Sequence, residues 1–215
     1  MKNFRFGAFE IFGYLVPGLM YWALILLAIN RFSLASLFEK VSTFNFYNIL
    51  AIFFFAHLTT LSLETVAGRF QKFTIKMIKR STRQKRVIDI FKNENPEAKS
   101  DPKIDDYKFG FLYTFAEVCS PQTREKADTF SAMGNMAINL GFGLFLFAVI
   151  NTFYWFLNFD FTLWPIMIFE FISSLLFSII LLLRAEDFKS YSHSHLLNAY
   201  YIITQVRDPN LKNNL

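Results

Sequence analysis

Two ionisable residues, His57 and Glu170, lie within long apolar segments. Glu170 is the one charged residue of segment 162–183, and a carboxylate inside a bilayer must be protonated, paired or in contact with water. Counting the helical rise puts Glu170 about 12 Å and His57 about 16 Å below the same membrane surface. His57 is therefore the natural partner of Glu170, in a contact that the geometry allows but does not require, with the second and fourth spans meeting diagonally or across a subunit boundary. The intramembrane polar site also includes Thr60, Asn139 and Asn151.

These polar residues support two interpretations. One is a proton or ion site, or the lining of a polar pore, as ionisable groups within membranes commonly indicate. The other is a set of buried hydrogen bonds that fixes helix packing, as polar groups do between membrane helices. The packing interpretation is favoured, because one ionisable pair is a small network for transport.

Four apolar segments are each long enough to cross a bilayer, which takes about 20 helical residues. We expect membrane spans near 11–30, 44–64, 135–157 and 162–183, joined by a tight turn at 158–161. Pro17 and Gly18 interrupt the first span. Either residues 3–14 form a separate interfacial helix, or 11–30 form one kinked helix, which the short distance from Pro17 to Asn30 favours.

Orientation follows from the positions of Lys and Arg. The region 64–134 has 14 of the 22 cations and the turn 158–161 has none. Basic loops stay in the cytoplasm, which predicts that both termini and the central region are cytoplasmic. The expected location is the bacterial cytoplasmic (inner) membrane.

The central region begins with a basic helix, expected at 64–91 as a continuation of the second span. It is followed by a linker at 92–106 and by an apolar stretch, 109–119, whose state the sequence leaves open. Ser120 and Pro121 form a helix start, from which a helix can run unbroken into the third span. The second and third spans would then extend into the cytoplasm as a helical stalk.

The basic helix has three interpretations: contact with anionic lipid headgroups, binding of a cytoplasmic partner or nucleic acid, or a topological signal with a solvated face. Lipid contact and topology are favoured, and nucleic acid is not an expected partner, since no base-stacking surface or nucleic-acid-binding module is present. The residues concerned are Arg69, Lys72, Lys76, Lys79, Arg80, Arg83 and Arg86.

No sequence motif of a known catalytic class is present, and no catalytic residue, metal site or cofactor is predicted. His193 and His195 are two residues apart, which on a helix directs them to different sides. The single cysteine, Cys119, excludes an internal disulfide. One protomer of four spans leaves a wide apolar perimeter, so a homo-oligomer is expected.

The segment 4–22, with Tyr14, Leu15, Pro17 and Gly18, resembles the start of small, uncharacterised bacterial multi-span membrane proteins. Some of these occur among antiphage defence genes. The resemblance implies a membrane subunit that senses or executes a defence response together with a cytoplasmic partner. It transfers no functional residue to this chain.

The sequence thus predicts an all-α protein, a four-helix transmembrane bundle with a cytoplasmic helical extension of spans 2 and 3. The expected parts are an N-terminal hairpin (1–64), a basic stalk (65–134), a C-terminal hairpin (135–183) and a cytoplasmic tail helix (184–215). The expected function is a non-enzymatic sensor, scaffold or pore-forming subunit of a bacterial membrane response. The alternative is a small intramembrane enzyme or a proton or ion transport subunit that uses His57 and Glu170.

Overall fold

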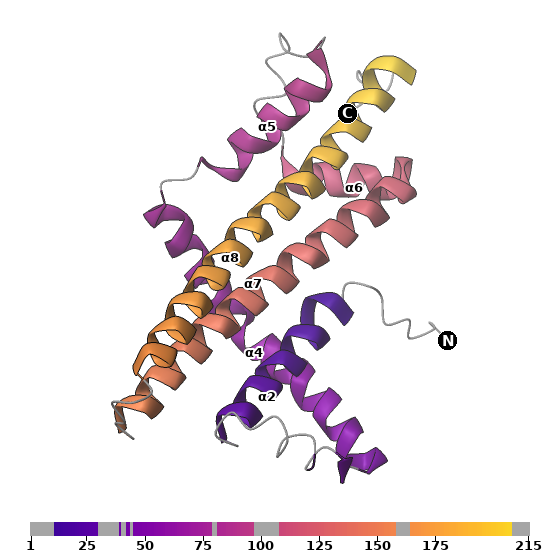
Figure 1. Cartoon of the computed structure of the whole chain (residues 1–215). Coiled ribbons are helices and arrows are strands. Elements are labelled where there is room, and N and C mark those ends of the chain that lie inside the picture. The colour runs from indigo at the N-terminus through magenta and orange to yellow at the C-terminus, as the bar shows by residue number, and fades with distance from the viewer. Residues whose placement is uncertain are drawn as a thin grey trace. The chain divides into compact units, whose positions relative to one another are not determined.

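The computed structural model describes residues 11–29, 39, 42–43, 45–78, 81–96, 108–157 and 164–207. All regular elements in these ranges are helices, and no strand occurs among them. The helices are η1 (Ile11–Leu15), α2 (Val16–Ile29), α4 (Phe46–Met77), α5 (Arg83–Glu94), α6 (Phe109–Cys119), α7 (Pro121–Leu157), α8 (Trp164–Tyr201) and η5 (Ile202–Arg207) (Figure 1). The prediction of an all-α chain is confirmed.

Three described helices are long and apolar enough to cross a membrane: Phe46–Met77, Pro121–Leu157 and Trp164–Thr204. These fit the expected second, third and fourth spans. α2 is shorter, with 14 residues, and it follows directly from the π-helical turn η1. Residues 11–29 therefore form one continuous helix with a π-helical turn before Pro17. Residues 3–10 and Asn30, on which the two alternatives for the first span differ, lie outside the described residues.

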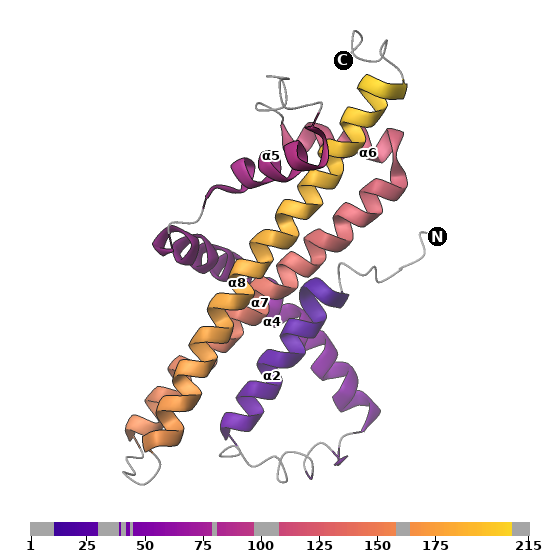
Figure 2. The same cartoon turned by 45° about the horizontal axis from the view of Figure 1, so that its top comes forward.

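The chain divides into two compact units. Unit 1 comprises Met1–Ile78 with Asn135–Ala185, and unit 2 comprises Lys79–Gly134 with Glu186–Leu215. α7 and α8 run in opposite directions, side by side in both views (Figure 1 and Figure 2), and each contributes residues to both units.

The apolar core of unit 1 lies where α4, α7 and α8 meet. Its buried members are Ala67, Ala137, Ile138, Phe142, Leu182 and Ala185. Phe70 of α4 stacks beside Phe142 and Phe145 of α7, with ring centroids 5.6 and 4.3 Å away. Three of the buried members are alanines, and small residues let helix backbones approach closely, as is common in membrane proteins.

The core of unit 2 combines α5, α6, the start of α7 and the end of α8. Its buried members are Val87, Phe91, Leu112, Ala116, Ala127, Leu196 and Leu197, with Tyr113, Tyr200 and Tyr201 packed around them. The apolar stretch 109–119, whose state the sequence left open, is the helix α6, because it buries Leu112, Phe115 and Ala116 in this core.

The expected continuous basic helix at 64–91 is wrong. α4 ends at Met77 and α5 begins at Arg83, while Lys79 and Arg80 lie outside the described residues. Thr82 is the N-cap residue of α5 and has an extended backbone, but its hydroxyl makes no capping hydrogen bond. Ser and Thr have lower helix propensity than the residues around them, which favours a helix break at 81–82.

Two predicted helix boundaries have clear outcomes. α7 begins at Pro121 and runs 37 residues without a break, as the Ser120–Pro121 pair predicts. The tail, expected as a helix at 184–215, is helical in its described part, because α8 runs through Arg184 to Tyr201 and η5 continues it to Arg207. The turn 158–161 lies outside the described residues.

Candidate functional site: polar contacts within the apolar helices

In an α-helical register the donor to a carbonyl is the N–H four positions later, so Pro17, which has no N–H, would leave one carbonyl of the first helix without that donor. That carbonyl belongs to Gly13, and Asn139 Nδ2 of α7 donates to its oxygen at 3.0 Å. The Asn139 backbone carbonyl in turn accepts a 2.5 Å hydrogen bond from the hydroxyl of Tyr21. Asn139 is 1% exposed, and it joins α7 to both sides of the irregular turn.

Gly18 brings α2 against α4 at backbone distance. A Cβ atom at this position would overlap the carbonyl oxygen of Ala56, which is itself fully buried. One turn further along α2, Trp22 Nε1 donates to Thr59 Oγ1 at 3.3 Å. The two residues of the Pro17–Gly18 pair differ in role: the proline follows the π-helical turn η1, and the glycine allows α2 to cross α4 closely.

His57 lies beside Tyr14, not beside Glu170. The His57 and Tyr14 rings meet edge to face with centroids 5.7 Å apart, and the Tyr14 hydroxyl donates to Glu64 Oε1 and Oε2 at 3.2 and 3.3 Å. His57 and Glu64 are seven residues apart on α4, so one aromatic ring contacts both. Thr60, between them, is fully buried and donates within its own helix to the carbonyl of Ala56.

Glu170 pairs with Asn151. Asn151 Nδ2 donates to Glu170 Oε2 at 2.8 Å across the α7–α8 hairpin. Among the described residues, the hydrogen bonds of Glu170 join its side chain to Asn151 of α7 and its carbonyl to Ser173 of its own helix, and no described hydrogen bond or ion pair joins it to His57. Pairing depends on helix rotation and register, which matching depths along the membrane do not determine.

The five predicted polar residues therefore do not form one site. His57 and Thr60 lie on α4, with His57 facing η1, Asn139 faces η1 and α2, and Asn151 faces Glu170. Ser178 adds another interhelical bond, because its hydroxyl donates to the Gly141 carbonyl at 2.6 Å. Most of these contacts are short bonds to a neighbouring helix or to the residue's own helix, which is the pattern of helix packing.

The predicted basic surface is divided between the two units. Arg69, Lys72 and Lys76 are exposed on the last turns of α4, beside the exposed apolar side chains Phe73 and Met77. Cations beside apolar positions at the end of a membrane span can reach lipid headgroups while their stems lie along apolar surface.

Arg83 and Arg86 are engaged inside unit 2. Both hold Glu186 of α8, with Arg83 Nη2 2.5 Å from Oε1 and Arg86 Nη2 2.8 Å from Oε2, and Arg86 also lies 3.6 Å from Asp187. Glu186 is 5% exposed. Burial alone raises the pKa of its carboxyl, but the hydrogen bond and charge of Arg83 and the charges of Arg86 and Lys189 outweigh burial and lower it.

His193 is a second titratable group of unit 2 with a shifted pKa, and the sequence alone did not predict this shift. Burial, with the nearby positive charges of Arg83 and Lys189, lowers its pKa to about 3. The ring is in contact with Phe109 of α6. His193 is therefore neutral at physiological pH, as is typical of a histidine used for packing. His195 stacks on Phe130, so the two histidines contact different helices.

At the other end of α5, an amide chain completes its attachment to α8. Asn95 Nδ2 donates to Asn198 Oδ1, and Asn198 Nδ2 donates to Glu94 Oε2, both at 2.5 Å. Polar contacts thus hold both ends of α5, and Val87 and Phe91 fill the core between them.

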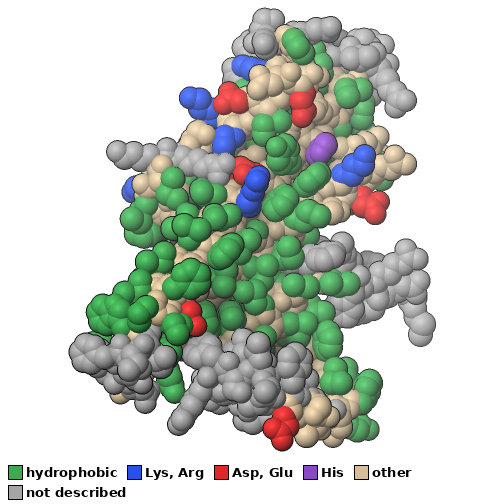
Figure 3. Space-filling view, in the orientation of Figure 1, with side chains coloured by type: hydrophobic (Ala, Val, Ile, Leu, Met, Phe, Trp, Pro, Cys, Tyr) green, Lys and Arg blue, Asp and Glu red, His purple; other side chains and the backbone are tan. Residues whose placement is uncertain are grey.

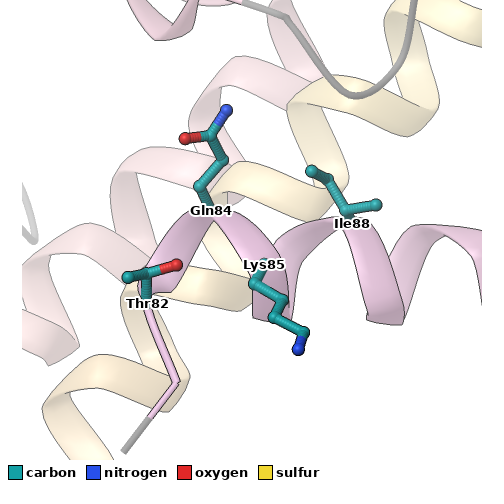
Figure 4. A pocket seen from close by; sticks show the side chains of 4 residues that line it. All are labelled: Thr82, Gln84, Lys85 and Ile88. Atoms are coloured by element: carbon teal, nitrogen blue, oxygen red, sulfur yellow. The ribbon is translucent and has the colours of Figure 1, made fainter. Parts of the chain in front are cut away.

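A shallow depression of about 290 Å³ on unit 2 is lined by Thr82, Gln84, Lys85 and Ile88. Figure 4 shows that Lys85 points away from Gln84 and Ile88, so the polar groups of this lining do not converge. Among the described residues no group of three His, Cys, Asp or Glu side chains is placed to hold a metal ion.

No protein-family model, curated protein or solved structure matches the chain.

Proposed function

We propose that the chain is a non-enzymatic integral membrane subunit of a bacterial membrane response, with unit 1 as a membrane scaffold and unit 2 as a cytoplasmic module for a protein partner. The observation that carries the scaffold role is the bonding of Asn139. A buried amide joins α7 to the broken first helix, and the Tyr21 hydroxyl closes the same junction. Side chains committed to such bonds hold helices in place.

The membrane part of the proposal is supported by the three long apolar helices. Hydrophobic side chains cover much of the visible face of the α7–α8 hairpin in unit 1 (Figure 3), and large apolar residues along α4 and α8 are exposed, as a lipid-facing surface requires. We extend this to four spans by counting Ile11–Ile29 as the first, and we propose that Arg69, Lys72 and Lys76 contact anionic headgroups.

The cytoplasmic placement of unit 2 rests on the concentration of cations in residues 64–134. Unit 2 has its own apolar core and its own ion pairs, and these give it the rigidity that a docking module needs. We propose that the chain acts as a homo-oligomer, since large apolar side chains along α4 and α8 lie open around a single protomer.

A membrane-potential dye in cells that express the chain tests the scaffold role. A scaffold leaves the potential at the level of cells carrying an empty vector, and a matched Gly18→Leu variant controls for expression of a disrupted unit 1. Collapse of the potential with the parent chain alone would contradict a scaffold and indicate a pore. Crosslinking from exposed positions of unit 2, such as Asn93, to a neighbouring-gene product would test the partner.

A further inference from the structure

Asn151 and Glu170 form an isolated polar pair in the apolar part of the α7–α8 hairpin. Asn151 is 4% exposed, and its Nδ2 donates to Glu170 Oε2 at 2.8 Å. Its other polar atom, Oδ1, is buried and accepts no hydrogen bond from the described residues. The pair therefore has one amide donor in use, Asn151 Nδ2, and one buried amide acceptor, Asn151 Oδ1, that is not in use.

No cation neutralises Glu170 in the described part of unit 1. On its own helix the nearest basic residue in sequence is Arg184, 14 positions or about 21 Å away. The facing helix α7 has no charged residue between Asp128 and its end, and its titratable residue near the pair is Tyr154. α2 has no ionisable side chain other than Tyr21, which bonds to Asn139, and His57 of α4 lies against Tyr14.

Among the printed contacts of the described residues, one amide donor, Asn151 Nδ2, reaches the Glu170 carboxylate. An ionised carboxylate with so few donors is costly in hydrocarbon. A protonated carboxyl carries no charge but needs an acceptor for its O–H. The side-chain amide of Asn151 offers both functions, a donor in Nδ2 and an acceptor in Oδ1.

We propose that Asn151 and Glu170 form an intramembrane proton-binding site. In the ionised state of this proposed site the carboxylate accepts from Asn151 Nδ2, through the 2.8 Å contact present in the structure. When one proton is taken up from water, the carboxyl O–H donates to Asn151 Oδ1 after the amide turns over, and the charge of the site falls from −1 to 0. No other covalent bond changes. The proton is thus a ligand of the membrane scaffold proposed above, and its binding does not require the cytoplasmic protein partner.

Infrared difference spectroscopy on the purified full-length chain tests the site. Spectra recorded between alkaline and acidic buffer contain a carboxylic acid carbonyl band for each group that takes up a proton, and exchange into heavy water shifts such bands. Glu170→Gln should remove one band entirely. Glu117→Gln, which removes an exposed carboxylate of unit 2, should leave that band in place.

Two further variants give the pairing its own readout. Asn151→Leu should keep the Glu170 band but move it to higher frequency, because the carboxyl then lacks its acceptor. If Glu170→Gln fails to fold, Glu170→Asp replaces it in the test. Its carboxylic acid carbonyl band should remain, at a different frequency from the band of the parent chain. The proposal is overturned if the spectra of the parent and Glu170→Gln are identical, or if the band is unmoved in Asn151→Leu. Neither result bears on the membrane-potential experiment.

Discussion

The side-chain amide of Asn139 bonds to the carbonyl of Gly13, to which Pro17 has no N–H to donate in an α-helical register. A proline inside a membrane helix is tolerated when a neighbouring helix satisfies the freed backbone group. The bond thus explains how an irregular turn in the first helix can persist in an apolar environment, and why a polar residue lies buried on α7.

Replacing Asn139 by Leu should lower the stability of unit 1 by about 1 kcal/mol, the usual scale for an interhelical hydrogen bond. Thermal unfolding in detergent, monitored by circular dichroism, measures this loss of stability. Pro17→Ala supplies the missing N–H, so the cost of Asn139→Leu should shrink in that background. Equal costs in both backgrounds would show that the amide does not act through the Gly13 carbonyl.

Gly18→Ala should destabilise unit 1 by about 1–3 kcal/mol, the range for overpacking, because the added Cβ would meet the backbone of Ala56. Gly68 is the matched control, since a Cβ there meets nothing within 4 Å. Gly68→Ala should leave stability unchanged or raise it by up to about 1 kcal/mol. Similar losses in the two variants would mean that α2 and α4 do not cross at Gly18.

Tyr14→Phe removes the hydroxyl that donates to Glu64 and keeps the ring that lies against His57. We expect a loss of about 0.5–1.5 kcal/mol. Glu64→Gln should cost a similar amount, and the double variant no more than either alone, since both remove one interaction. Additive losses would contradict the bond.

Glu186→Gln should destabilise unit 2 by about 3 kcal/mol, because it leaves two arginines without their buried partner. Glu117→Gln, which breaks the more exposed pair with Arg124, should cost less than about 1 kcal/mol. Because the pKa of Glu186 is lowered by folding, its stabilisation is present at neutral pH and is lost as pH falls below its ordinary value of 4.5. Glu186→Gln should remove that acid dependence.

His193 predicts a second acid dependence. The folded protein keeps it neutral down to a pKa of about 3, whereas the unfolded chain takes up a proton near 6.5. The free energy of unfolding should therefore fall as pH is lowered from 6.5 towards 3. His193→Phe should flatten this slope, and Tyr191→Phe, an exposed neighbour, should not. An unchanged slope in His193→Phe would show that the ring is solvated.

Much of the helix content follows from the sequence alone, because charge-free apolar runs and the Ser120–Pro121 start mark where helices begin and end. Which side chains meet does not follow from these signals. Matching depths along the membrane suggest that Glu170 pairs with His57. Depth does not give the register of neighbouring helices, and the side chain that bonds to Glu170 is Asn151 on α7. Residues 151 and 170 are symmetric about the connection between α7 and α8, and residues at equal distances from the turn of an antiparallel hairpin lie opposite each other. That symmetry could have identified the pair.

The partners of Arg83 and Arg86 were hidden for a different reason. A uniform run of cations looks solvated, and only the break at Ser81 and Thr82 turns α5 towards Glu186, about 100 residues later in the chain. Contacts over such separations depend on tertiary packing that local patterns do not contain.

Accessibility of Cys119 to a membrane-impermeant thiol reagent tests the central claim, that unit 1 spans the membrane and unit 2 is cytoplasmic. Cys119 is the single cysteine, and it is exposed. In intact cells it should stay unlabelled and should react only after the membrane is permeabilised. Cys119→Ser combined with Asp160→Cys, in the predicted outer turn, should react in intact cells. Strong labelling of Cys119 in intact cells, with Asp160→Cys protected, would contradict the account.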